Sequence, residues 1–158
     1  MSGALNLTEL REGGTQDLGE VNRIMQDSFD PRFGEAWTSA QCLGMLALPG
    51  VWLVVASLDG EDAGFALARA IGDEAELLLL ATRPDARRRG IAGALLRAIV
   101  AEARARGVVQ LHLEVRAGND AVRLYRREGF EKVGERRNYY RGKMGQAFDA
   151  HTYARKLG

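Results

Sequence analysis

In residues 77–96, LLLLATRPDARRRGIAGALL, an apolar run is followed by a turn and then by a helical pattern. The turn ends in three consecutive arginines, residues 87–89, directly before Gly90. Four consecutive leucines are typical of a strand that is covered on both faces, as at the centre of an α/β sheet. Small residues follow Gly90, and apolar side chains then recur at helical spacing. Because the free amides and the dipole of a helix N-terminus attract anions, this strand–turn–helix segment predicts a phosphate-binding turn.

The arginines of this turn have two interpretations. They could form an ordinary solvated face, but cations at a helix start oppose the helix dipole and cost stability unless an anion offsets them. Gly90 permits a tight turn, and the small residues Ala92 and Gly93 leave the backbone open to a ligand. Neither the Walker nor the dinucleotide glycine pattern is present. We therefore favour an anion site of another kind.

Length and composition indicate one globular domain, and we expect it to span residues 1–158. No window approaches about 18 consecutive apolar residues, so no membrane span is expected. The single cysteine, Cys42, precludes an internal disulfide and fits a reducing compartment, which predicts a cytoplasmic location. With only two histidines, a metal site is not expected. The sequence does not determine the oligomeric state.

Charge is divided unevenly along the chain. Residues 1–82 contain 13 acidic and 4 basic side chains, whereas residues 83–158 contain 8 acidic and 18 basic ones. Such a division suggests that the second half faces an anion. Nucleic acid would also explain it, but aromatic residues do not alternate with the basic stretch 83–106, and no zinc or RNA-binding motif appears. Nucleic-acid binding is therefore disfavoured.

Hydropathy patterns predict an α/β fold with a mixed sheet. Glycine and proline turns separate the elements, and residues 136–146 resemble a strand end followed by a loop. The predicted strands are 6–12, 51–57, 63–71, 75–82, 108–115, 130–133 and 147–157, and the predicted helices are 15–29, 38–48, 91–106 and 119–128. This order, β-α-α-β-β-β-α-β-α-β-β, favours helices on both faces of the sheet.

Two motifs resemble the GNAT acyltransferases. Residues 87–92, RRRGIA, match the acetyl-CoA loop [QR]-x-x-G-x-[GA] of that family. Residues 111–130, LHLEVRAGNDAVRLYRREGF, are similar to the strand, the Asn-capped helix and the Leu-Tyr-x-x-x-Gly-Phe segment that follow it there. The resemblance implies the GNAT acyltransferase fold, a mixed, mostly antiparallel sheet flanked by helices on both faces. It also implies acetyl-CoA as co-substrate and no metal.

The same resemblance implies which residues hold the cofactor. The backbone of Ala81 and Thr82, at the end of the central strand, would pair with the pantetheine arm as an added strand. Asn119 would bond that arm and cap its own helix. At the turn, Gly90 and the backbone amides are expected to matter more than the side chains of the second and third arginines. The predicted cofactor-binding residues are Ala81, Thr82, Arg87, Arg88, Arg89, Gly90, Ile91, Ala92, Gly93 and Asn119.

Two residues are candidates for acid–base chemistry. Glu114 lies in a strand whose apolar neighbours point to the opposite face, and burying such a charge is costly, although a partly open sheet face would also accept it. Tyr125 would be a core aromatic by composition alone. The resemblance implies that Glu114 is the general base, acting through a water, and that Tyr125 is the general acid that protonates the departing thiolate. His112 shares the face of Glu114, and we expect it to be a surface or packing residue.

Within the family, LEVR, LYRREGF and RRNYY resemble the ribosomal-protein alanine N-acetyltransferases. That branch implies the N-terminal α-amine of a protein, such as a ribosomal protein, as acceptor, with Trp37, Arg137, Asn138 and Tyr139 at the substrate groove. The loop at residues 30–36 is longer than in that branch, and residues 147–157, AFDAHTYARKL, are less aliphatic. A small amine, such as a polyamine or aminoglycoside, is the alternative acceptor, because the acidic first half suits such cations.

Overall fold

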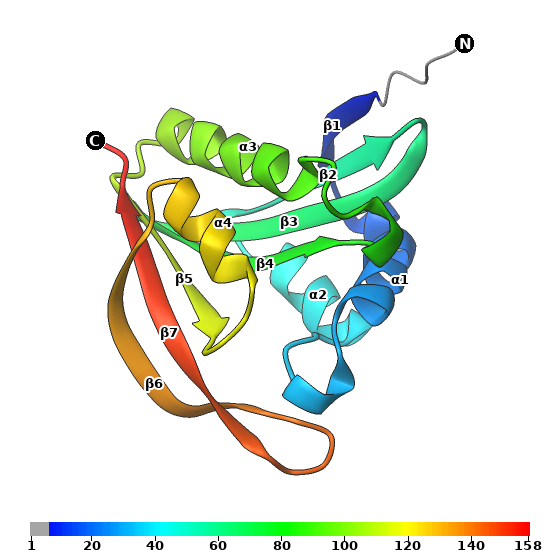
Figure 1. The fold of residues 1–158 in the computed structure, drawn as a ribbon. Coiled ribbons are helices and arrows are strands. Elements are labelled where there is room, and N and C mark those ends of the chain that lie inside the picture. The colour runs from blue at the N-terminus through cyan, green and yellow to red at the C-terminus, as the bar shows by residue number, and fades with distance from the viewer. Residues whose placement is uncertain (1–6) are drawn as a thin grey trace.

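The computed structural model describes residues 7–158, which form one seven-stranded sheet with helices on both faces (Figure 1). The sheet order is β1-β2-β3-β4-β5-β7-β6, and only β4 and β5 pair in parallel. The strands are β1 (Thr8–Gly13), β2 (Val51–Leu58), β3 (Glu61–Ile71), β4 (Glu74–Thr82), β5 (Gln110–Arg116), β6 (Glu131–Arg141) and β7 (Ala147–Lys156). The helices are α1 (Leu18–Ser28), α2 (Ser39–Leu46), α3 (Ile91–Ala105) and α4 (Ala121–Arg127), with short 3-10 turns η1 (Thr15–Asp17), η2 (Pro31–Phe33) and η3 (Pro84–Ala86).

Two apolar layers hold the helices against the sheet. On one face, α3 and α4 pack over alternate strand residues such as Ala66 and Ala68. On the other face, α1 and α2 cover Phe65 and Leu67 of the same strand. The alternation along β3 therefore supplies both layers, as expected of a central strand. The predicted mixed, mostly antiparallel sheet with helices on both faces is confirmed.

A β-bulge at Leu78 interrupts the central run of leucines. Leu77 pairs with Ala68 and Leu79 pairs with Leu67, so Leu78 is the extra residue. As a result Leu77 faces α3, whereas Leu78 and Leu79 both face α1. A bulge bends its strand and ends regular pairing, which matters here because β4 has β5 as its other neighbour.

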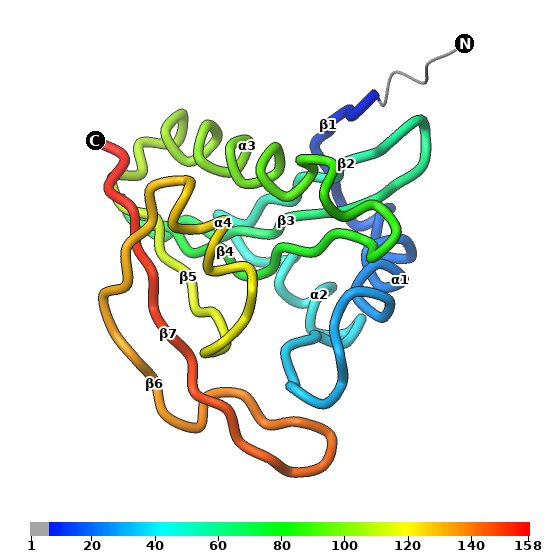
Figure 2. Tube along the Cα trace, viewed as in Figure 1, coloured from blue at the N-terminus to red at the C-terminus, as the bar shows by residue number. Residues whose placement is uncertain are grey.

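The parallel pairing of β4 with β5 stops at this bulge. Only Glu74–Leu77 pair with Gln110–Leu113, and the two strands then separate, as the traces in Figure 2 show. Beyond that point β5 pairs with β7 alone, up to Arg116 opposite Ala150. The separation opens a gap in the middle of the sheet.

The predicted element order agrees with the structure, with differences at the boundaries. The strand predicted at 130–133 continues to Arg141, because Tyr140 and Arg141 pair with Phe148 and Ala147 of β7. The predicted first strand begins at Asn6, which lies outside the described residues. Across residues 7–158, no helix is both long and apolar enough to cross a membrane.

Candidate active site

The edge of β4 that faces the gap is formed by residues 78–82. After the bulge residue Leu78, residues 79–82 pair with β3 on one side, and within the described part of the chain no strand pairs with residues 78–82 on the other. Ala81 and Thr82 are 5% and 8% exposed, so the edge lies deep in the protein. An extended ligand could add to such an edge as a further strand. The Oγ1 atom of Thr82 is buried and has no hydrogen-bond partner in residues 7–158.

The turn after β4 leaves a run of backbone amides unpaired. Arg88 and Gly90 both have left-handed backbones, with φ of 65° and 78°. The amides of residues 88–93 find no acceptor anywhere in residues 7–158, and α3 begins at Ile91. Free amides at the start of a helix suit an anion, and we call residues 88–93 the amide cradle.

The three arginine side chains at this turn have different environments. Arg87 donates from Nη2 to the carbonyl oxygen of Ser28 at 3.0 Å, which connects the turn to the end of α1. The Ser28 hydroxyl in turn donates to the carbonyl oxygen of Thr82 at 3.0 Å. Arg88 and Arg89 are exposed. Arg87 thus joins the turn, α1 and the end of β4, while the other two side chains remain in solvent.

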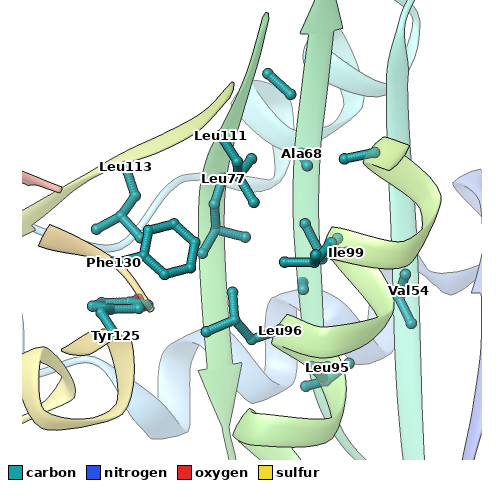
Figure 3. Packing of buried hydrophobic residues seen from close by; sticks show 14 of the residues in the cluster. Val54, Ala68, Leu77, Leu95, Leu96, Ile99, Leu111, Leu113, Tyr125 and Phe130 are labelled. Atoms are coloured by element: carbon teal, nitrogen blue, oxygen red, sulfur yellow. The ribbon is translucent and has the colours of Figure 1, made fainter. Parts of the chain in front are cut away.

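Glu114 and Tyr125 lie on opposite faces of the sheet beside the gap. Leu113 and Val115 point into the layer beneath α3 and α4, so Glu114 between them points to the other face. Tyr125 belongs to the α3–α4 layer, where its ring meets that of Phe130 edge-on with centroids 6.0 Å apart (Figure 3). Groups on the two faces could therefore approach a ligand in the gap from opposite sides.

Tyr125 is a buried phenol beside the gap. Burial, and after it the negative charge of Glu35, raises the pKa of Tyr125 well above the usual value for tyrosine. The phenol is therefore fully protonated at neutral pH. The Glu114 side chain is only 7% exposed, and its carboxylate meets Arg136 at 3.3 Å and the Thr152 hydroxyl at 2.7 Å.

Two further residues complete the site. Glu35 lies in the loop between η2 and α2, and it bonds Arg116 at 3.3 Å and Asn119 at 2.9 Å. The Tyr140 hydroxyl donates to the backbone carbonyl of Glu114 at 3.2 Å. Burial, with Glu35 next in effect, also raises the pKa of Tyr140 above its usual value. Sequence reasoning did not single out Glu35, and it included Tyr140 only as the last residue of the RRNYY motif, next to the predicted groove residue Tyr139.

Asn119 has a different local role from a simple cap. Its Oδ1 accepts from the amide of Ala121 at 2.8 Å, while Asp120 occupies the position before the first helical residue. Its Nδ2 donates to Glu35. Both ends of the amide are therefore bonded within the protein, and a contact with a pantetheine arm requires Nδ2 to leave Glu35.

The predicted acceptor residues divide into two groups. Arg137, Asn138 and Tyr139 form a bulge in β6, because the pairing passes from Arg136–Ala150 to Tyr140–Phe148. Asn138 has a left-handed backbone (φ 55°), and its amide donates to Asp149 at 2.9 Å, which holds the bulge in place. Trp37 belongs instead to the layer beneath α1 and α2, where its amide meets the sulfur of Met25 at 3.3 Å.

The bulge directs Tyr139 toward acidic groups. Burial, then the charges of Glu76 and Glu114, raises the pKa of Tyr139. Its ring meets that of Tyr140 edge-on at 5.0 Å. His112 lies 3.9 Å from Glu76, as expected of a residue with a structural partner on the sheet. Residues 7–158 contain no cluster of three or more histidine, cysteine or acidic side chains that could hold a metal.

Comparison with known proteins agrees with this geometry. The model of the acetyltransferase (GNAT) family matches residues 18–130. The chain belongs to this family. This GNAT protein is 46% identical over 83 residues to a [ribosomal protein bS18]-alanine N-acetyltransferase of Salmonella typhimurium, a match that covers 52% of this chain and 56% of that protein. The matched part is thus little more than half the length of that relative.

Solved structures extend the likeness over the chain. The crystal structure of the ribosomal-protein-S18-alanine N-acetyltransferase from Escherichia coli superposes with a TM-score of 0.85 and 31% identity, covering 96% of this chain and 95% of that one. Arabidopsis thaliana NAA60, crystallised with acetyl-CoA, has a TM-score of 0.81 at 23% identity and covers 96% and 99% of the two chains. The second likeness concerns the fold alone.

Proposed function

We propose that this GNAT protein transfers an acetyl group from acetyl-CoA to the N-terminal α-amine of a protein, of the ribosomal-protein-alanine type. The observation that carries the proposal is the gap between β4 and β5, which has an amide cradle at residues 88–93 and Glu114 and Tyr125 on its two faces. The 31% identity to the E. coli enzyme over 95% of its chain supports the same acceptor class.

The residues present fit acetyl-CoA as co-substrate. The cradle amides have no acceptor within the described residues and suit the phosphates. The β4 edge at Ala81 and Thr82 suits the amide groups of the pantetheine arm. The unpartnered Thr82 hydroxyl is a further buried polar group at this edge. When bound, the thioester supplies the activated acetyl group.

Glu114 and Tyr125 have complementary tasks in this transfer. An N-terminal amine has a pKa of roughly 7.7–8.0, so a carboxylate acting through a water suffices to remove its proton. Glu114 takes one proton from the ammonium through a water, and the neutral nitrogen then bonds to the acetyl carbon. The bond from this carbon to sulfur breaks, and Tyr125 gives its phenolic proton to the departing thiolate. The second proton, released by the nitrogen as it becomes an amide, returns the Tyr125 phenolate to its phenol.

An acceptor assay tests the proposal. Release of free CoA is measured with peptides that begin with alanine, with the same peptides blocked at the N-terminus, and with a panel of polyamines and aminoglycosides. We expect turnover with the free peptides and none with the blocked ones. Turnover of the small amines alone would identify the other acceptor class and overturn this one.

A further inference from the structure

Both oxygens of the Glu114 carboxylate are held by the last two strands. Thr152 of β7 lies directly opposite Glu114 in the β5–β7 ladder, and its hydroxyl donates to Oε2 at 2.7 Å. Arg136 of β6 approaches Oε1 with Nε at 3.3 Å. Neither contact is evident from the sequence, because Thr152 is separated from Glu114 by 38 residues.

The two partners hold the carboxylate unequally. The Arg136 side chain is 61% exposed, so water competes for its contact and screens its charge. A hydroxyl bonded to a buried carboxylate is a short, charge-assisted contact. Threonine is also branched at Cβ, which limits its side chain to few rotamers and keeps its hydroxyl in place. Thr152 is therefore the partner that defines the orientation of Glu114.

We infer that Thr152 is a positioning residue for the general base: it holds Oε2, so that Oε1, which only the exposed Arg136 approaches among the described residues, is the oxygen that serves the acceptor amine and its water. The inference rests on the role proposed above for Glu114. It assigns a function to the polar C-terminal strand, whose residues differ from a plain aliphatic strand.

Among the described residues, the Thr152 hydroxyl is the hydrogen-bond donor to Oε2 of Glu114. Its loss leaves that oxygen without a donor among the described residues. The neighbouring charged or titratable groups are Arg136, Tyr139 and Tyr140 from β6, Glu76 from β4 and His112 from β5 itself.

The test compares Thr152→Val, which keeps the shape and removes the hydroxyl, with Thr152→Ser, which keeps the hydroxyl. For each variant, kcat and the KM values for the accepted peptide and for acetyl-CoA are measured at neutral pH. We expect Thr152→Val to lower kcat about tenfold, because a base that is no longer held in place removes the proton less often. The KM for acetyl-CoA should stay unchanged, and Thr152→Ser should remain within about twofold of the original chain.

Each kcat is referred to the concentration of folded enzyme, measured by circular dichroism, so partial unfolding of Thr152→Val does not obscure the result. A kcat of Thr152→Val equal to that of the original chain, or an equally large fall of kcat in Thr152→Ser, would overturn the inference. Glu114→Gln is measured alongside. If that variant keeps full activity, the proposed role of Glu114 has failed; if it is impaired while Thr152→Val is not, only the role of Thr152 has failed.

Discussion

Glu35 and Asn119, 84 residues apart in the sequence, are joined by a 2.9 Å hydrogen bond beside the gap in the sheet. Glu35 also pairs with Arg116, and the side chains of this pair are only 10% and 15% exposed. The loop after η2 is therefore attached to the end of β5 and the start of α4. Since Tyr125 lies on that same helix, the attachment links the predicted acceptor side to the predicted cofactor side.

Removal of Glu35 should destabilise the protein. Glu35→Ala leaves Arg116 partly buried without its partner, and we expect the free energy of unfolding to fall by about 2–4 kcal/mol. The matched control is Glu20→Ala, which removes an exposed ion pair with Arg23 on α1. This control should change the free energy of unfolding by less than about 0.5 kcal/mol. Urea unfolding measures both. Equal effects would mean that the Glu35 pair behaves as a surface pair.

Tyr125→Phe should reduce kcat at least about tenfold with little change in the affinity for acetyl-CoA, because only the proton donor is lost. Tyr140→Phe is the informative comparison, since Tyr140 is a second buried phenol whose raised pKa also keeps it protonated. Steady-state kinetics and binding are measured on both variants. A larger loss of kcat in Tyr140→Phe, with near-normal turnover in Tyr125→Phe, would assign the acid to Tyr140.

Glu114→Gln should lose most activity at low pH and progressively less as the pH rises. The reason is that the acceptor α-amine has a pKa of roughly 7.7–8.0, and above that pH it loses its proton without the help of a base. The ratio of kcat/KM between the original chain and the variant, measured from about pH 6 to 9.5, should therefore fall with pH. A ratio that stays constant would indicate that Glu114 positions the substrate and does not remove a proton.

At the turn, Gly90→Val should weaken acetyl-CoA binding more than Arg88→Ala does. Gly90 has a left-handed backbone (φ 78°), which a β-branched residue adopts only with strain, so the substitution distorts the amide cradle. The Arg88 side chain is exposed, and its removal leaves the amides in place. Calorimetric titration with acetyl-CoA measures the affinity of each variant. Weaker binding by Arg88→Ala would show that the turn acts through side-chain charge.

Asp17 should contribute to stability in a pH-dependent way. Burial alone would raise its pKa, but hydrogen bonds from Arg11 and from the Gly14 amide outweigh burial and lower it. Since the folded protein binds the Asp17 proton less tightly than the unfolded chain, its contribution is complete above the unfolded pKa of about 4 and disappears as the pH falls below that value. The difference in unfolding free energy between the original chain and Asp17→Asn should therefore be constant above about pH 5 and shrink below about pH 4. The exposed Asp27→Asn should show no such trend.

The sequence by itself determined the local elements of the protein. The run at residues 77–80 predicts a central strand, and the small residues after Gly90 predict an open helix start, because strand and helix periods and backbone angles are local properties. The resemblance then named Glu114 and Tyr125. Only the structure shows that these two residues lie on opposite faces of the sheet.

Only the tertiary structure decided how the site is held together. The bulge at Leu78 ends the pairing of β4 with β5, and the bulge at residues 137–139 holds Tyr139 near Glu76 and Glu114, yet both bulges depend on register with a neighbouring strand. The bond from Thr152 to Glu114 joins residues that are far apart in the sequence. Such contacts form when strands pair and loops pack across the sheet. The local sequence pattern of one strand does not determine which residue of a distant strand will lie opposite a given side chain.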